Sequence, residues 1–176
     1  MNMRSQPQQR ICKSDNKDDL FTPEVREEID NWISKYPSEW RQSAVMGALI
    51  VVQEHNGGNL TPDLMDRVAE YLDMPPVSVY EVATFYTMYE HKPVGRHKIC
   101  LCSSISCMIG GSDQIRDHIK SKLDIDFGEV TKDGKFSIKE VECLGACGGA
   151  PMMQIGHSYY ENLSIDSVDK ILDGLE

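Results

Sequence analysis

Apolar residues recur at intervals of three and four through the first half of the chain, which is the period of a helix with one buried face. Proline and glycine interrupt this pattern and divide it into separate helices. Thr22 and Thr61 each precede a proline, so both fit the N-cap position of a helix. The pattern therefore predicts a small helical bundle, with helices over residues 22–36, 38–55, 61–73 and 79–89.

The fourth helical stretch ends in three aromatic side chains, Phe85, Tyr86 and Tyr89. Packing within the core or between helices is the preferred interpretation of this group. The alternative is a partner-binding face, because aromatic residues and methionine are enriched in interface cores. We expect these side chains to be packed among the helices.

Beyond Pro93 the apolar pattern changes to that of short strands that alternate with two helices. One helix begins near Ser112, and a last helix begins at Ser164 or Asp166. A small sheet covered by helices suits this order of elements. The predicted strands cover residues 97–101, 127–130, 136–141, 152–155 and 158–160.

These patterns predict an α+β chain whose second half is α/β-like. We expect a helical bundle over residues 20–92 and a second domain over residues 93–176. Residues 1–19 are polar and charged and have no apolar period, so they cannot bury enough surface to offset the entropy lost on ordering. We expect this segment, which contains Cys12, to be a mobile tail.

Composition and charge remove several classes of function. The chain has 176 residues and a formal net charge of −10, and its basic residues are scattered. Nucleic acids and anionic lipids are bound by clustered basic side chains, so neither is an expected partner. No apolar run approaches the roughly 18 residues of a membrane span, and the first residues lack the apolar stretch of a secretory signal. A cytoplasmic location is therefore expected.

Four of the six cysteines form two short clusters, Cys102-x4-Cys107 and Cys143-x3-Cys147. Each cluster directly follows a predicted strand, where a loop can turn its thiolates toward a shared site. Thiolates are soft ligands that select zinc, copper(I) or iron-sulfur clusters. Small serine and glycine residues in both loops would let backbone N–H groups approach the sulfur atoms and stabilise an added electron. The pattern favours an iron-sulfur cluster bound by these four cysteines.

The spacing leaves other kinds of site open. Structural zinc commonly uses two-residue spacers but also occurs with four, so a zinc-stabilised adaptor protein is one alternative. A redox disulfide or inert buried thiols are others. The spacing differs from those of plant-type and bacterial ferredoxins, so it implies neither of those folds.

The remaining cysteines and the histidines are not expected to bind the metal. Cys100 shares a strand face with Cys102 and is expected to face the core, and Cys12 has no neighbour at ligand spacing. No Walker motif and no G-x-G-x-x-G after a strand is present, so the substrate and dinucleotide sites are expected on a partner. The following histidines do not stand beside a cysteine pair and are expected at the surface or in a hairpin: His91, His97, His118 and His157.

Several motifs resemble those of one known family. They are CSSISC at residues 102–107, EVECLGAC at residues 140–147, the following Ala150-Pro151, and VATFYTMY at residues 82–89. Together they are similar to the E-type subunit of NADH:quinone oxidoreductase, the bacterial respiratory complex I, from about residue 20 to the C-terminus. The polar segment before residue 20 does not match the family pattern.

The resemblance implies a thioredoxin-like 2Fe-2S ferredoxin domain after the helical bundle. It places Cys102 and Cys107 on one iron, and Cys143 and Cys147 on the other. In the family this protein packs against the F-type flavoprotein subunit, which holds NADH, FMN and a 4Fe-4S cluster. FMN and NADH are therefore expected on the partner and not on this chain.

The implied function is that of an electron-transfer subunit in the oxidation of NADH by quinone. The 2Fe-2S cluster of the family lies near the flavin but off the main chain of clusters, so storage of one electron or a structural role is expected more than through-conduction. The subunit would be peripheral on the cytoplasmic side of the inner membrane, held there through the other peripheral-arm subunits. Related subunits of NAD-linked hydrogenases and formate dehydrogenases are alternatives, although the helical region before the cluster favours complex I.

Overall fold

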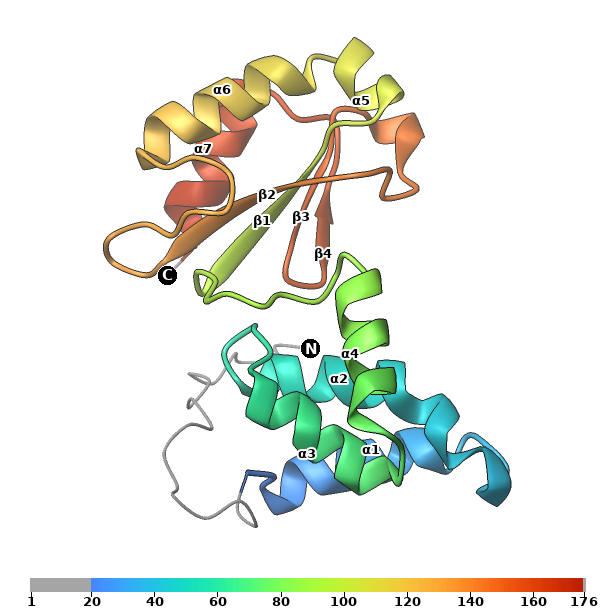
Figure 1. Ribbon diagram of the computed structural model, residues 1–176. Helices are drawn as coiled ribbons and strands as arrows, with labels where there is room; N and C mark the ends of the chain where they lie inside the picture. The colour runs from blue at the N-terminus through green and yellow to red at the C-terminus, as the bar shows by residue number, and fades with distance from the viewer. Residues whose placement is uncertain (1–19, 176) are drawn as a thin grey trace. The chain divides into compact units, whose positions relative to one another are not determined.

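The computed structural model describes residues 20–175, so the predicted tail with Cys12 lies outside the described residues (Figure 1). Contacts divide the chain into two compact units, with the boundary between Pro93 and Val94. Each unit has its own hydrophobic core. Within residues 20–175, no helix is long and apolar enough to cross a membrane.

Helices make up the described part of the first unit. Thr22 and Thr61 are N-caps as predicted, because each hydroxyl oxygen accepts a hydrogen bond of 3.4 Å from the backbone N–H three residues later. A proline follows each cap and fits the first turn, where a backbone N–H has no helical partner to lose. The elements are α1 (Pro23–Ile33), η2 (Ser38–Ala44), α2 (Val45–His55), α3 (Pro62–Leu72) and α4 (Pro76–Phe85).

Residues 38–55 do not form one helix, contrary to the prediction. The stretch begins as the 3-10 helix η2, in which Trp40 has the non-helical angles φ −112° and ψ 26°, and α2 begins only at Val45. Most of η2 is exposed, whereas most of α2 is buried. Burial in the bundle, which stabilises helices more than local propensity does, therefore decides where the regular helix begins.

The aromatic group after α4 is only partly packed. Tyr89 is buried, and its hydroxyl donates to the carbonyl oxygen of Met46 at 3.0 Å. Burial raises the pKa of Tyr89 to about 12. Phe85 and Tyr86 have relative exposures of 76% and 39%. The predicted packing is therefore right for Tyr89 and wrong for Phe85 and Tyr86.

A four-stranded mixed sheet forms the centre of the second unit, with helices packed beside it (Figure 1). The strand order is β2-β1-β3-β4, in which β1 and β2 run parallel and β3 pairs antiparallel with both β1 and β4. The predicted α+β class is confirmed. The elements are β1 (His97–Cys102), α5 (Ile105–Ile109), α6 (Ser112–Leu123), β2 (Phe136–Val141), η3 (Cys147–Gly149), β3 (Met153–Ile155), β4 (Ser158–Tyr160) and α7 (Ile165–Gly174).

The predicted strand over residues 127–130 is wrong. This stretch lies in the loop after α6, where Val130 forms only an isolated bridge with Ser137. Gly128 has a positive φ of 80°, which bends the chain away from a strand conformation. Phe127 packs against the core of the unit from this loop. The short apolar run is therefore explained by packing beside the sheet and not by pairing within it.

The register of the parallel pair brings the two cysteine loops together. His97 lies opposite Phe136, and Cys102 lies opposite Val141. The two strands therefore end level, and the residues that follow them leave the same edge of the sheet. Because parallel strands need a crossover connection, α5 and α6 occupy the chain between them. The loops that carry the cysteine clusters consequently begin side by side.

Gly95 permits the close backbone approach with which this strand pair begins. A Cβ atom at position 95 would overlap the carbonyl carbon of Phe136 and lie 2.6 Å from the nitrogen of Ser137. Both are backbone atoms, so the two strands must move apart to admit a methyl group. We expect Gly95→Ala to lower the free energy of unfolding of the second unit by about 1–3 kcal/mol. Urea denaturation of the full-length chain measures this loss.

Gly174→Ala is the control for that substitution. Among the described residues, nothing lies within 4 Å of a Cβ atom built at Gly174. Position 174 ends α7, so alanine there should leave the stability unchanged or raise it by up to about 1 kcal/mol. Equal losses of stability in the two variants would contradict the role given to Gly95.

Candidate metal centre

The first predicted ligand loop, residues 102–107, turns directly from β1 into the short helix α5. Ser104 precedes α5 with an extended backbone, and its carbonyl oxygen accepts a hydrogen bond from the Met108 N–H at 3.0 Å. This turn places Cys102 at the end of the strand and Cys107 within the helix. Both thiols are buried, with relative exposures of 2% and 1%, and they pack in one cluster with Met152.

The second predicted ligand loop, residues 142–147, leaves β2 and ends in the 3-10 turn η3. Gly145 has a positive φ of 83°, a conformation that glycine adopts without a steric penalty. The turn brings the Sγ atoms of Cys143 and Cys147 to 3.4 Å from each other. Two thiolates on one tetrahedral metal, each about 2.3 Å from it, would stand about 3.7 Å apart. The observed separation is therefore close to that of a ligand pair, and this pair is exposed.

The four thiols form one electrostatic group. Burial raises the pKa of the Cys107 thiol, and both Cys102 and Cys147 act in the same direction. The hydrogen bond with Cys143 raises the pKa of the Cys147 thiol, and Cys102 adds to this effect. The buried pair and the exposed pair therefore lie within electrostatic range of each other, as a shared site requires.

Hydrogen-bond donors reach the sulfur atoms from both loops. Burial alone would raise the pKa of the Cys102 thiol, but hydrogen bonds that include those from the backbones of Ser104 and Leu144 bring it below its ordinary value. The Gly145 N–H donates to the Sγ atom of Cys143 at 3.4 Å. Such donors favour the thiolate, which is the form that binds a metal.

Segments outside the loops fix the shape of the second loop. The Tyr159 hydroxyl donates to the carbonyl oxygen of Leu144 at 2.9 Å, and the Asn162 N–H donates to the carbonyl oxygen of Gly149 at 2.6 Å. Glu161 packs so closely over Gly149 that a Cβ atom there would overlap its carboxylate. The loop is thus held by β4 and by the residues that follow it.

The donor set fits a cluster with two irons. Such a cluster takes four thiolates, two on each iron, and the thiols here form one buried pair and one exposed pair. Among the described residues, no three His, Cys, Asp or Glu side chains are grouped as ligands of a single metal ion.

Cys100 is not a core residue, so the prediction for its environment is wrong. Ile99 and Leu101 lie in the core of the second unit, whereas Cys100 on the other face of β1 is half-buried. Two of the histidines have partners away from the thiols. The Nε2 atom of His91 bonds to the Ala83 carbonyl oxygen at 3.0 Å, and that of His118 bonds to an Asp169 carboxylate oxygen at 2.8 Å.

Sequence periodicity did not predict α5. The outer face of this helix is a second feature of the site. Ile105, Met108 and Ile109 have relative exposures of 69%, 48% and 83%. Residues three and four apart share one face of a helix, and Cys107 is buried on the other side. The surrounding residues 100–112 carry no charged side chain. We call the three exposed residues the α5 face.

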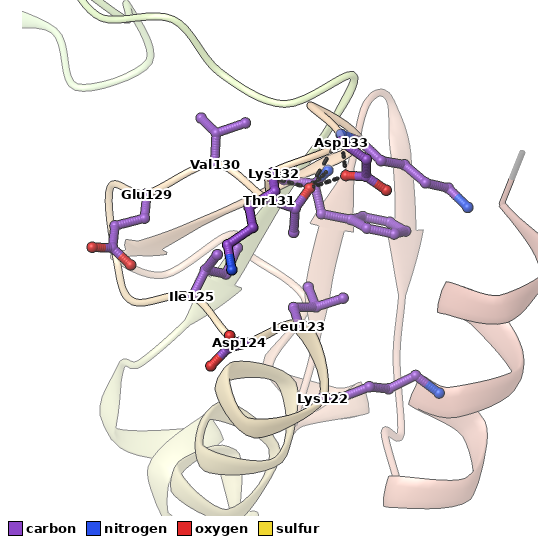
Figure 2. Close-up of a pocket in the computed structure, with 11 residues that line it drawn as sticks. Lys122, Leu123, Asp124, Ile125, Glu129, Val130, Thr131, Lys132 and Asp133 are labelled. Atoms are coloured by element: carbon purple, nitrogen blue, oxygen red, sulfur yellow. Dashed lines mark hydrogen bonds between the residues drawn. The ribbon is translucent and has the colours of Figure 1, made fainter.

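A cleft lies beside the loop that connects α6 to β2 (Figure 2). Phe136, at the start of β2, lines this cleft, whereas the second ligand loop leaves the end of that strand. The cleft and the cysteines therefore lie at opposite ends of β2. Figure 2 shows that lysines and carboxylates both project around the cleft, which gives it no single charge preference. Its lining contains no cysteine and consists of Lys122, Leu123, Asp124, Ile125, Glu129, Val130, Thr131, Lys132, Asp133, Lys135 and Phe136.

Comparison with known proteins identifies similar sequences over most of the chain. A family model described as thioredoxin-like [2Fe-2S] ferredoxin matches residues 29–176. The E-type subunit of NADH-quinone oxidoreductase from Rickettsia bellii is 48% identical over 143 residues, which cover 81% of this chain and 86% of that protein. An E-type subunit of the same enzyme from Rhizobium meliloti, designated E 2, is 42% identical over 149 residues, covering 85% and 87%.

Two further similarities are to a mitochondrial protein and to a hydrogenase. The mitochondrial NADH dehydrogenase [ubiquinone] flavoprotein 2 of Dictyostelium discoideum is 41% identical over 156 residues, which cover 89% of this chain and 63% of that protein. An NAD+-reducing [NiFe]-hydrogenase chain superposes with a TM-score of 0.57 at 19% identity, over 63% of this chain and 19% of the hydrogenase chain. At that identity the hydrogenase shows a common fold alone.

Proposed function

Because the chain belongs to the thioredoxin-like [2Fe-2S] ferredoxin family, and within it to the group of E-type subunits of NADH-quinone oxidoreductase, we propose that it is an electron-transfer subunit of that enzyme. One observation carries this proposal: two cysteine pairs converge from the level ends of neighbouring parallel strands. When bound there, a 2Fe-2S cluster would supply the exchange of one electron.

The ligands in this proposal are Cys102 and Cys107 on one iron and Cys143 and Cys147 on the other. The buried pair would anchor the cluster in the second unit, while the exposed pair would keep its other side near the surface. Three partly buried apolar residues pack against the buried pair and would exclude water from it: Leu144, Ala146 and Ala150. Residues 20–92 would form a bundle domain and residues 93–176 the cluster domain, which the contact boundary after Pro93 supports.

The partner in this proposal is the F-type flavoprotein subunit, which would hold FMN and NADH. A cluster without a substrate site of its own must exchange electrons with a redox group on another chain. The α5 face adjoins the buried ligand Cys107 and offers three large apolar side chains in an uncharged surrounding. Interface cores are enriched in methionine and depleted of charge, so this face suits a protein partner.

NADH oxidation would take place on the partner, and this chain would have no separate substrate site. The cluster would store one electron from the flavin or stabilise the complex, beside the main path to quinone. The subunit would be held on the cytoplasmic side of the membrane through the peripheral-arm subunits of the complex. Co-purifying membrane-arm chains would support complex I, and a nickel-iron or molybdenum subunit would point to a hydrogenase or formate dehydrogenase.

Metal and sulfide analysis of the purified full-length chain tests the proposed cluster. We expect about two irons and about two acid-labile sulfides per chain. After reduction with dithionite, we expect the low-temperature EPR signal of a spin-half centre. A silent EPR spectrum together with one zinc per chain would instead support the zinc-stabilised adaptor and refute the redox function.

A further inference from the structure

Ser104 and Glu142 connect the two ligand loops. Just beyond the paired ends of β1 and β2, the Ser103 N–H donates to the carbonyl oxygen of Val141 at 3.1 Å. The side chains of the next residues then form a bond across the same gap, in which the Ser104 hydroxyl donates to Glu142 Oε2 at 3.3 Å. Glu142 directly precedes the ligand Cys143, so this bond ties one ligand loop to the other.

Ser104 follows Cys102 by two residues in the first ligand loop, so the Cys102 sulfur is a second acceptor for its hydroxyl. A hydroxyl carries a single hydrogen, so it cannot donate to the carboxylate and to the sulfur at once. Carboxylate oxygens accept strong charge-assisted hydrogen bonds. The Ser104 backbone N–H favours the thiolate of Cys102 in either case. Glu142 therefore decides whether Cys102 receives one donor or two from Ser104.

Glu142 also brings a negative charge to the second ligand loop, in addition to the Glu161 carboxylate that packs over Gly149. No other charged side chain lies within two residues of Cys102, Cys107, Cys143 or Cys147. An added electron makes a four-thiolate cluster more negative, so a nearby carboxylate opposes reduction. Hydrogen bonds to the ligand sulfurs have the opposite effect, because they stabilise the added charge. The negative charge of Glu142 and its hydrogen bond with the Ser104 hydroxyl therefore both lower the reduction potential of the cluster.

We propose that Glu142 is a positioning residue that keeps the reduction potential of the cluster low, by holding the Ser104 hydroxyl away from Cys102 and by placing a negative charge beside the second ligand loop. This inference rests on the proposed function, since it requires a cluster bound by the four thiols. It assigns Glu142 no direct contact with the metal.

Redox titration of the full-length chain with its cluster assembled tests this role. Glu142→Gln keeps the size of the side chain and removes its charge. We expect the equilibrium constant for one-electron reduction by dithionite to rise about three- to tenfold, followed by visible absorption and EPR. A tenfold rise corresponds to about 59 mV for one electron. An unchanged or lower reduction potential would overturn the proposal.

Glu140→Gln is the matched control. Glu140 is an exposed residue of β2, two residues before Glu142, and its charge acts on Arg116. The same net charge is removed about 7 Å further along the chain. We expect a shift of less than half that caused by Glu142→Gln. Equal shifts would mean that only the total charge matters, which would overturn the positional role of Glu142.

Ser104→Ala separates the hydrogen bond from the charge. Without the hydroxyl, Glu142→Gln can act only through its charge, so its effect on the potential should be smaller in the Ser104→Ala background. Fully additive shifts would overturn the shared hydroxyl. Iron and sulfide content distinguishes the two possible failures: a wild-type chain without iron refutes the proposed function, whereas a full cluster with an unmoved potential refutes only the role of Glu142.

Discussion

Serine at position 102, 107, 143 or 147 is expected to leave the full-length chain without its 2Fe-2S cluster or with a strongly altered spectrum. An alcohol binds iron more weakly than a thiolate, which is the soft ligand that iron-sulfur clusters require. The loss should be larger for Cys102→Ser and Cys107→Ser, because both thiols are buried and water cannot reach the vacated ligand position. Iron and sulfide analysis with the visible spectrum measures the result.

Cys100→Ser is the internal control for this series. Cys100 lies two residues before Cys102 on β1, and its half-buried side chain belongs to neither core cluster of the second unit. We expect this variant to keep near-normal iron content and spectrum. Loss of the cluster in Cys100→Ser, with retention in Cys102→Ser, would show that the ligand assignment on β1 is wrong. Cys12→Ser should likewise behave as the wild type.

Ile109→Asp is expected to weaken binding to the proposed flavoprotein partner at least tenfold. Burial of an isoleucine side chain contributes about 1.5–3 kcal/mol, and about 1.4 kcal/mol corresponds to tenfold in affinity. A carboxylate at the same position would also have to be desolvated in the interface. Because Ile109 is 83% exposed, the substitution should not affect folding of the isolated chain. Titration of the partner onto each variant measures the affinity.

The control for this variant is Ile165→Asp. Ile165 is also exposed, at 44%, but it lies at the start of α7 and outside the α5 face. We expect the Ile165→Asp chain to bind the partner with wild-type affinity. If Ile109→Asp bound equally well, the docking surface would have to lie elsewhere on the chain.

Much of the fold could be predicted because the decisive signals are local. The caps at Thr22 and Thr61 fix two helix starts through their own hydroxyl groups and the prolines that follow. The six-residue strands β1 and β2 are likewise close to their predicted bounds. In each case the signal lies within a few residues of the element that it specifies.

The wrong predictions concern segments whose structure depends on contacts with distant parts of the chain. Phe127 to Val130 has the composition of a strand, yet the partner edge of β2 offers it only the bridge at Ser137. The start of α2 depends on burial against the rest of the bundle, and Phe85 is exposed although it ends an apolar stripe. The helix α5 has five residues, too few for its periodicity to be recognised.

Cysteine spacing predicted only part of the candidate site. Spacing alone favours the four cysteines that the two loops bring together, and their assignment as ligands stays a prediction. The cysteine pattern favours iron-sulfur over zinc chemistry but leaves zinc open, and the family resemblance, which the comparisons confirm, decides between them. The bond between Ser104 and Glu142 had no sequence signal, because it depends on the level ends of two strands that are far apart in the chain.

The crossover between β1 and β2 also sets an order of events during biosynthesis. The thiols of Cys102 and Cys107 leave the ribosome first and can be brought close by the local turn into α5. The second pair reaches them only after β2 has paired with β1, which closes a long loop that contains α5 and α6. Such non-local pairing is slower than local folding. A nascent chain that ended before Val141 would therefore present only half of the predicted ligand set to an iron donor, so insertion of the proposed cluster must follow the pairing of β2 with β1.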